Sequence, residues 1–180
     1  VRVKCWRRTV KLRPGWPSEQ AVEAGAGKRL TFIRHAEGWH NKHSRELANY
    51  YPDKLWATDT YWDAKLTPEG EAQAYTIAVK QQWRQMRGKP ELVVVSPLTR
   101  ALQTATIGFP NHTTPSGLAI AAPPFVATSL ARERVWTHTC DKRRPRDEIK
   151  VAFPHVDFRE VAPGLDEMWD HKEDEPSADD

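Results

Sequence analysis

The chain has 180 residues, which favours one domain, or most of one, with room for a buried core. Apolar residues make up 39% and charged residues 28%, values compatible with a soluble globular protein. The net charge of +3 hides a basic start and an acidic end. We expect a disordered extension over residues 1–28, a folded domain over 29–170 and an acidic tail over 171–180.

Composition also argues against several classes of partner. The basic start has no interleaved aromatic platform or recognised binding motif, so we expect no nucleic-acid partner. No apolar run approaches the ~20 residues that cross a bilayer, and no secretory segment is visible, so we expect no membrane partner. Cys5 and Cys140 form no disulfide framework or CxxC metal site, which predicts a cytoplasmic protein, although the Arg-rich start leaves organelle targeting open. The sequence does not predict an oligomeric state.

The first half of the chain predicts a strand and two helices. The apolar run Leu30–Ile33 predicts a short strand, and Lys42–Tyr51 predicts a helix. Thr67 is a good N-cap and Pro68 a good first helical residue, so a second helix is expected over 67–87.

The second half continues the alternation. Leu92–Val95 predicts a strand buried on both faces of a parallel sheet, and Ser96 predicts an N-cap for a helix to Thr106. A loop over 108–124 precedes a third strand at Phe125–Thr128, and the polar segments beyond predict little clear structure. This alternation predicts an α/β fold in which a mainly parallel sheet is flanked by helices.

Polar side chains follow the first two predicted strands. Arg34 and His35 follow the first, and Arg100 lies in the first turns of the helix after the second. Ligands of such sheets bind beyond the carboxyl ends of the strands, where a helix N-terminus also favours anions. Arginines suit phosphoryl oxygens, and an imidazole among them can attack phosphorus. Each motif alone is more typical of solvated surface residues than of catalysis, but together they favour a phosphoryl site.

Three ordered segments carry a resemblance to a known family: "FIRHAEGWHN", "DAKLTPEGEAQA" and "VVVSPLTRALQTA". Over roughly residues 30–170 their order and spacing resemble the histidine phosphatase superfamily, also called phosphoglycerate mutase-like proteins. The RHA form followed by HN is most similar to the plant, algal and fungal branch. The resemblance implies a three-layer fold, a small phosphorylated substrate and no metal or cofactor. It does not choose among mutases, sugar or protein phosphatases and phytases.

The resemblance also implies roles for individual residues. His35 matches the nucleophile that becomes phosphohistidine, and Arg34 and Arg100 match the arginines that bind the phosphoryl oxygens. Asn41 matches a polar residue of the phosphoryl pocket. Glu133 falls where the family has the proton donor to the leaving oxygen, a role for which burial would keep the carboxyl protonated.

Two of these assignments have alternatives. Glu133 is also placed to form a surface ion pair with Arg132 or Arg134. The basic run 142–144, with Arg143 at its centre, resembles this branch and is expected either to meet an anionic substrate or to form a solvated basic face.

Other matching residues are expected to be structural. Thr67, Gly70 and Gln73 match family residues that shape a supporting helix, and Ser96 is expected to cap its helix rather than to take part in chemistry. Neither His40 nor His138 is expected to bind a metal, because neither has carboxylates or histidines at the spacing of a metal site.

The family places a second catalytic histidine after a later strand, and no residue here matches it. His155 follows a proline without a preceding apolar strand, and His171 lies in the acidic tail. We therefore expect an incomplete gene product or fragment that lacks a late core strand, which would leave apolar edges exposed.

Two hypotheses of function follow. The first is a phosphomonoester phosphatase (a hydrolase) or phosphoryl transferase that acts through phosphohistidine at His35. The second is a catalytically impaired relative that acts as a phosphate-binding or interaction protein, so the sequence leaves open whether the chain is an enzyme.

Overall fold

The computed structural model describes residues 30–46, 59–79, 90–113, 119–133, 135 and 138–170. The chain forms two compact units, Val1–Arg34 and His35–Asp180. The predicted extension over 1–28 and the predicted tail over 171–180 lie outside the described residues.

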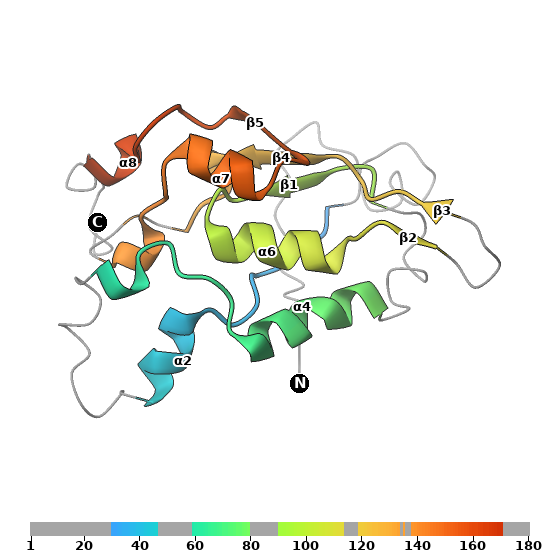
Figure 1. Cartoon of the computed structure of the whole chain (residues 1–180), viewed down its shortest axis with the longest axis horizontal. Coiled ribbons are helices and arrows are strands. Elements are labelled where there is room, and N and C mark those ends of the chain that lie inside the picture. Colours follow the sequence, from blue (N-terminus) through green and yellow to red (C-terminus); the bar gives the residue numbers. More distant parts are fainter. Residues whose placement is uncertain are drawn as a thin grey trace, which may run out of the picture. The chain divides into compact units, whose positions relative to one another are not determined.

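The second unit contains a three-stranded parallel sheet in the order β1-β4-β5 (Figure 1). Val93 pairs with Phe125, and Phe125 pairs with Val156, which fixes the register of all three strands. The predicted α/β class, a parallel sheet flanked by helices, is confirmed. The strands of this sheet are β1 (Val93–Val95), β4 (Phe125–Thr128) and β5 (Val156–Glu160).

Helices and short 3-10 turns connect and cover these strands. The α-helices of the described residues are α2 (Trp39–Glu46), α4 (Pro68–Val79), α6 (Thr99–Gly108), α7 (Arg146–Ala152) and α8 (Glu167–Asp170). The 3-10 turns are η1 (Asp59–Tyr61), η2 (Ser129–Ala131) and η3 (Thr139–Asp141).

One face of the sheet carries the hydrophobic core. Alternate strand residues, among them Val95 and Phe125, form a single apolar cluster with Leu102 of α6 and Ile149 of α7. Since strand side chains alternate between faces, Val94 points the other way, and it is 57% exposed. The prediction that this strand is buried on both faces is wrong, because no described element covers the second face.

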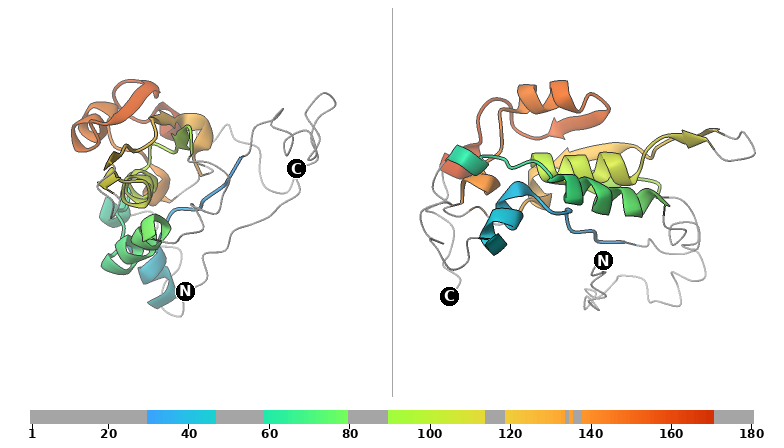
Figure 2. Two further views of the ribbon diagram at one scale, coloured as in Figure 1. Left: turned by 90° about the vertical axis from the view of Figure 1, so that its right-hand side faces the viewer. Right: turned by 60° about the horizontal axis from the view of Figure 1, so that its bottom comes forward.

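Helix α4 begins where the sequence predicted. Thr67 accepts a hydrogen bond on its hydroxyl from the Gly70 amide at 2.9 Å, as an N-cap does. Helix α4 lies beside α6 (Figure 2), and the close contact is made where Gly108 faces Ile77. The predicted continuation beyond Val79 falls outside the described residues.

The predicted strand at Leu30–Ile33 is not formed. These residues have no regular secondary structure and pair with no strand among the described residues, and Leu30 and Phe32 are 66% and 71% exposed. An apolar run becomes a strand only when a neighbour takes its amide and carbonyl groups, and hydrophobicity alone does not supply one.

The start of α6 differs from the prediction. The helix begins at Thr99 after an N-cap at Leu98, and Ser96 caps only the turn before it, by accepting a 3.3 Å hydrogen bond from the Leu98 amide. The carboxylate of Asp63 instead accepts the Thr99 amide at 2.8 Å. A side chain from a distant loop has therefore replaced the local cap.

Three further elements were mispredicted. Helix α2 begins at Trp39, three residues before the predicted start, and its predicted end lies outside the described residues. The expected loop over 108–124 contains a short antiparallel ribbon of β2 (His112–Thr113) and β3 (Ala119–Ile120). The polar segment after β4, expected to be irregular, contains η2, η3, α7, β5 and α8. The prediction missed these elements because their apolar residues are sparse and spaced for one-sided burial.

Among the described residues, no helix has the length and apolar character needed to span a membrane.

Candidate functional site

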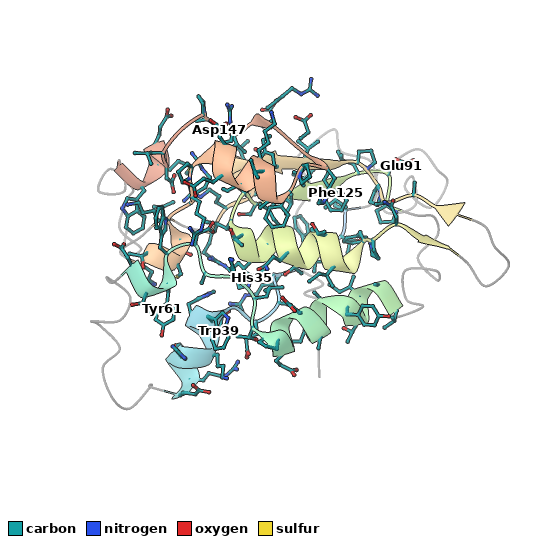
Figure 3. The ribbon with its side chains drawn as sticks, in the orientation of Figure 1. His35, Trp39, Tyr61, Glu91, Phe125 and Asp147 are labelled. Atoms are coloured by element: carbon teal, nitrogen blue, oxygen red, sulfur yellow. The ribbon has the colours of Figure 1, made fainter. Side chains whose placement is uncertain are left out.

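The imidazole of His35 opens the second unit, ahead of α2 (Figure 3). Its Nδ1 lies 2.7 Å from the carbonyl oxygen of Ala36. A carbonyl oxygen only accepts, so Nδ1 carries the hydrogen and the neutral ring has its lone pair on Nε2. The contact therefore selects one tautomer, and the role of His35 as nucleophile stays a prediction.

Helix α6 holds the segment after His35 from one side. The amide of Ala36 donates to the hydroxyl of Thr104 at 3.0 Å, and that hydroxyl donates to the Arg100 carbonyl at 2.7 Å. The His35 loop, by which we mean residues 35–38, is thus fixed to the helix that carries Arg100.

Helix α4 holds the same loop from the other side. The Glu37 amide donates to Gln73 Oε1 at 3.1 Å, and the Glu37 carbonyl accepts the Thr67 amide at 2.9 Å. At Gly70 a Cβ atom would lie 2.0 Å from the Glu37 oxygen, so only glycine permits this approach. The prediction that Thr67, Gly70 and Gln73 are structural is confirmed.

Asn41 ties the loop to the start of α2. Its Oδ1 accepts the Gly38 amide at 3.0 Å, the reverse contact of a capping box. The Trp39 amide donates to the Lys65 carbonyl at 3.0 Å, which adds a second anchor. The substrate contact of Asn41 stays a prediction, but its geometry is that of a helix cap.

Arg100 is buried, with only 2% of its surface exposed. Its guanidinium donates to the Cys140 carbonyl at 2.5 Å and to Asp141 Oδ1 at 2.8 Å, while its Nε has no hydrogen-bond partner among the described residues. The predicted phosphoryl contact of Arg100 stays a prediction, and Nε is a buried donor that the described contacts do not use.

Arg34 is the last residue of the first unit, and its side chain is exposed. Its predicted contact with the phosphoryl oxygens stays a prediction.

Asp63 is a site residue that the sequence did not single out. It is fully buried at φ 47°, a left-handed conformation that is uncommon outside glycine. Its two carboxylate oxygens accept the Thr99 amide at 2.8 Å and the Thr99 hydroxyl at 2.6 Å. The helix N-terminus expected to face a phosphoryl group therefore already holds one internal carboxylate. Burial raises the pKa of Asp63, and the Thr99 hydrogen bonds oppose that rise.

Arg143 is buried rather than solvated, with 2% of its surface exposed, so a solvated basic face is the wrong description of this residue. Burial lowers the pKa of its guanidinium, against the attraction of Asp166. Its guanidinium donates to the carbonyls of Arg144, Ala162, Gly164 and Leu165. The substrate contact of Arg143 stays a prediction, while its contacts support a bracing role.

A buried ion pair lies next to Arg143. Arg132 donates to both oxygens of Asp166, at 2.6 and 2.8 Å, and both side chains are almost fully buried. Asp166 also accepts the Arg143 amide at 2.7 Å. Because these partners lie 34 residues apart in the chain, sequence spacing gave no sign of them.

Glu133 is exposed. Its expected ion pair with Arg132 is not formed, because Arg132 binds Asp166, and Arg134 lies outside the described residues. The role of Glu133 as proton donor stays a prediction.

Two cations on either side of Arg143 are held by aromatic rings. The ammonium of Lys142 lies 5.7 Å from the ring centre of Trp62 and 5.6 Å from that of Trp169. The guanidinium of Arg144 lies 5.1 Å from Trp62. These separations are typical of cation–π contacts, so the indoles order two cations beside η3.

The other candidate groups have different surroundings. His155 precedes β5, receives or donates a 3.1 Å hydrogen bond with Thr106 and packs edge-on against Phe125, the first residue of β4. It therefore lies at the amino end of the parallel strands. Figure 3 separates Phe125 from His35 in the same sense. His171 lies outside the described residues.

Thiol and metal chemistry find no support among the described residues. Burial, with Asp141 nearby, raises the pKa of the Cys140 thiol to about 12, so it is protonated at neutral pH. No three His, Cys, Asp or Glu side chains of the described residues gather as metal ligands.

The chain is similar to curated proteins whose names agree with the sequence resemblance. It is 31% identical over 161 residues to "Phosphoglycerate mutase-like protein" of Arabidopsis thaliana, an alignment of 79% of this chain and 58% of that protein. It is 30% identical over 176 residues to "Phosphoglycerate mutase-like protein 1" of the same plant, covering 82% and 61%. It is 33% identical over 167 residues to "Probable phosphoglycerate mutase" of Arthroderma benhamiae, covering 81% and 45%.

These similarities support the histidine phosphatase, or phosphoglycerate mutase-like, superfamily as the class of this chain. The chain spans about half to three fifths of the length of these relatives. No protein family model and no solved structure matches it.

Proposed function

We propose that this chain is a phosphomonoester phosphatase or phosphoryl transferase that works through phosphohistidine at His35. The observation that carries the proposal is the hydrogen bond from His35 Nδ1 to the Ala36 carbonyl, because it selects the tautomer whose lone pair is on Nε2, the nitrogen that we propose attacks phosphorus. The names of the similar proteins and the anchoring of the His35 loop by two helices support it.

The proposed reaction has two steps. Nε2 of His35 attacks the phosphorus of a phosphomonoester, the P–O bond to the leaving group breaks and a P–N bond forms. The leaving oxygen takes a proton, for which Glu133 is our candidate donor. Water then attacks the phosphohistidine and releases phosphate, or a second alcohol takes the phosphoryl group.

The proposed anion contacts come from arginine. Nε of Arg100 is a buried donor without a hydrogen-bond partner among the described residues, and Arg34 adjoins His35 in the chain. A guanidinium matches the geometry of phosphoryl oxygens, so both would neutralise them in either step. We expect Lys142 and Arg144, rather than the bracing Arg143, to meet other charged parts of a substrate.

The test is direct detection of the intermediate. The chain is incubated with para-nitrophenyl phosphate, quenched in alkali and examined by phosphorus NMR for phosphohistidine, while phosphate release is followed separately. We expect a phosphohistidine signal that is lost in His35→Asn and retained in His155→Asn, a matched control at the other end of the sheet. Phosphate release without phosphohistidine, or full activity of His35→Asn, would refute the proposal.

A second function is favoured by one observation. Arg100 is already paired with Asp141 in a buried ion pair, so less of its charge is left to stabilise a transition state, which favours a catalytically impaired chain that only binds phosphate. Saturable binding of inorganic phosphate by a chain that forms no phosphohistidine would identify a phosphate-binding protein instead.

A further inference from the structure

A second imidazole lies against His35. The ring centres of His35 and His40 are 5.8 Å apart with the planes tilted by 48°, within the roughly 4.5–7 Å at which aromatic rings contact one another. His40 is only 6% exposed. In the sequence analysis, His40 was tested only as a metal ligand, a role that the spacing of carboxylates and histidines does not support.

The backbone around His40 is shaped to admit its ring. A Cβ atom at Gly38 would lie 2.7 Å from both Cε1 and Nδ1 of His40, closer than Cβ contacts occur. The ring thus occupies the space that any other residue at position 38 would fill. A side chain that is buried against a glycine and a second ring has little freedom to move.

The start of α2 fixes His40 relative to the His35 loop. His40 is the second residue of the helix, between Trp39, whose amide binds the Lys65 carbonyl, and Asn41, whose side chain binds the Gly38 amide. The two imidazoles therefore belong to one segment whose backbone is held at both ends. The confinement of the His40 ring against Gly38 keeps it in contact with His35.

The ring contact matters because an imidazole can rotate by a half-turn about its Cβ–Cγ bond. Such a flip in His35 exchanges Nδ1 with Cδ2 and Nε2 with Cε1, so it moves Nε2 away from its direction of attack and breaks the hydrogen bond to the Ala36 carbonyl. A ring packed against the imidazole opposes this rotation. Since attack on phosphorus needs Nε2 in one direction, blocking the flip keeps the nucleophile aligned.

We propose that His40 is a positioning residue that holds the His35 ring in its reactive orientation. The proposal rests on the proposed function, because it assumes that Nε2 of His35 is the reacting atom. It also makes a claim about ring orientation that does not depend on turnover.

The test compares His40→Ala, which removes the ring, with His40→Phe, which restores a ring without ring nitrogens. The matched control is His43→Ala, one turn later on α2, whose ring packs on Trp39 and Tyr61. Two quantities are measured: the rate and KM of phosphohistidine formation from para-nitrophenyl phosphate, and the nitrogen NMR shifts that report the hydrogen position on His35.

We expect His40→Ala to slow phosphohistidine formation about 100-fold at an unchanged KM, the scale of loss from an ångström of misplacement. The His35 ring of this variant should be a mixture of the two neutral tautomers, because the hydrogen bond from Nδ1 is no longer kept. His40→Phe and His43→Ala should resemble the parent in both measurements. A parental rate and parental nitrogen shifts in His40→Ala would overturn the proposal, as would an equal loss in His43→Ala.

Two further outcomes keep the tests separate. If the parent forms no phosphohistidine, the proposed function fails and the nitrogen shifts alone decide the role of His40. If His40→Ala melts below the assay temperature, Gly38→Ala replaces it, because its Cβ displaces the His40 ring while keeping the imidazole; parental nitrogen shifts in that variant would refute the positioning role.

Discussion

The His35 loop and the region around Asp166 are held in different ways. The loop is fixed by neutral hydrogen bonds to Thr104, Thr67 and Gln73 and by the close approach of Gly70. The Asp166 region is fixed by buried charge, with Arg132 bound to its carboxylate and Arg143 bound to backbone carbonyls. The position of the His35 loop thus depends on shape, and that of the Asp166 region depends on charge balance.

The difference predicts how each region fails. Removing one partner of a buried ion pair leaves an uncompensated charge, which costs far more than the pair itself contributes. Neutral hydrogen bonds each contribute about 1 kcal/mol, so the loop is sensitive mainly to atoms that intrude on it.

The largest effect is expected for Arg132→Met. It leaves Asp166 buried without its partner, and we expect the free energy of unfolding to fall by about 3–5 kcal/mol. Urea denaturation measures it. Arg159→Met is the control, since Arg159 pairs with Asp157 at the surface, and it should leave the denaturation midpoint unchanged. Equal midpoint shifts in the two variants would show that the buried charges are not what holds this region.

Gly70→Ala should come next. Its Cβ would lie 2.0 Å from the Glu37 oxygen, and moving that backbone should cost about 1–3 kcal/mol and slow any reaction of His35. Gly108→Ala is the matched control, because its Cβ meets only the Ile77 side chain, at 3.2 Å. Thermal melting and the rate of phosphohistidine formation measure both effects. The role assigned to Gly70 would be contradicted if Gly70→Ala had the same melting temperature as Gly108→Ala and formed phosphohistidine at the parental rate.

A smaller effect is expected at Asp63. Asp63→Ala removes both acceptors for Thr99 and should cost about 1–2 kcal/mol, the usual loss for a helix cap, whereas Asp63→Asn keeps one acceptor and should cost less.

The pKa of Asp63 gives this comparison a pH dependence. Because burial raises the folded-state pKa, the contribution of Asp63 to stability is fully present below its unfolded value near 3.8 and is lost as pH rises through the folded value. The difference in unfolding free energy should therefore move in favour of Asp63→Asn as pH rises through that interval. A difference that is constant with pH would contradict the raised pKa.

The smallest expected effect is on Cys140. The chain has a second cysteine, Cys5, so the test uses a Cys5→Ser background. With a thiol pKa of about 12 and a buried side chain, Cys140 of the folded chain should not react with iodoacetamide at pH 8 over hours. In Arg132→Met the thiol should become reactive as the population of unfolded chain rises. Rapid labelling of the parent would show that the carbonyl of Cys140 and its neighbour Asp141 hold Arg100 less firmly than their contacts indicate.

Local signals predicted what depends on local structure. Thr67 with Pro68 predicted the start of α4, and the apolar runs predicted β1 and β4, because caps and buried strands are set by neighbouring residues. The resemblance also selected Gly70 and Gln73 as structural residues, and both contact Glu37.

Partners distant in the chain could not be predicted in this way. The cap of α6 comes from Asp63, which lies 36 residues before Thr99, and not from the adjacent Ser96. The burial of Arg143 likewise depends on carbonyls about 20 residues ahead, so a basic run that looked solvated contains a buried brace. Leu30–Ile33 had the composition of a strand without a strand to pair with.

The hydroxyl of Thr104 joins the His35 loop to Arg100. It receives the amide of Ala36 and donates to the carbonyl of Arg100, the residue whose guanidinium reaches Cys140 and Asp141. One oxygen atom therefore connects the backbone beside His35 to the backbone of Arg100. The mutation Thr104→Val would remove both hydrogen bonds without changing either side chain.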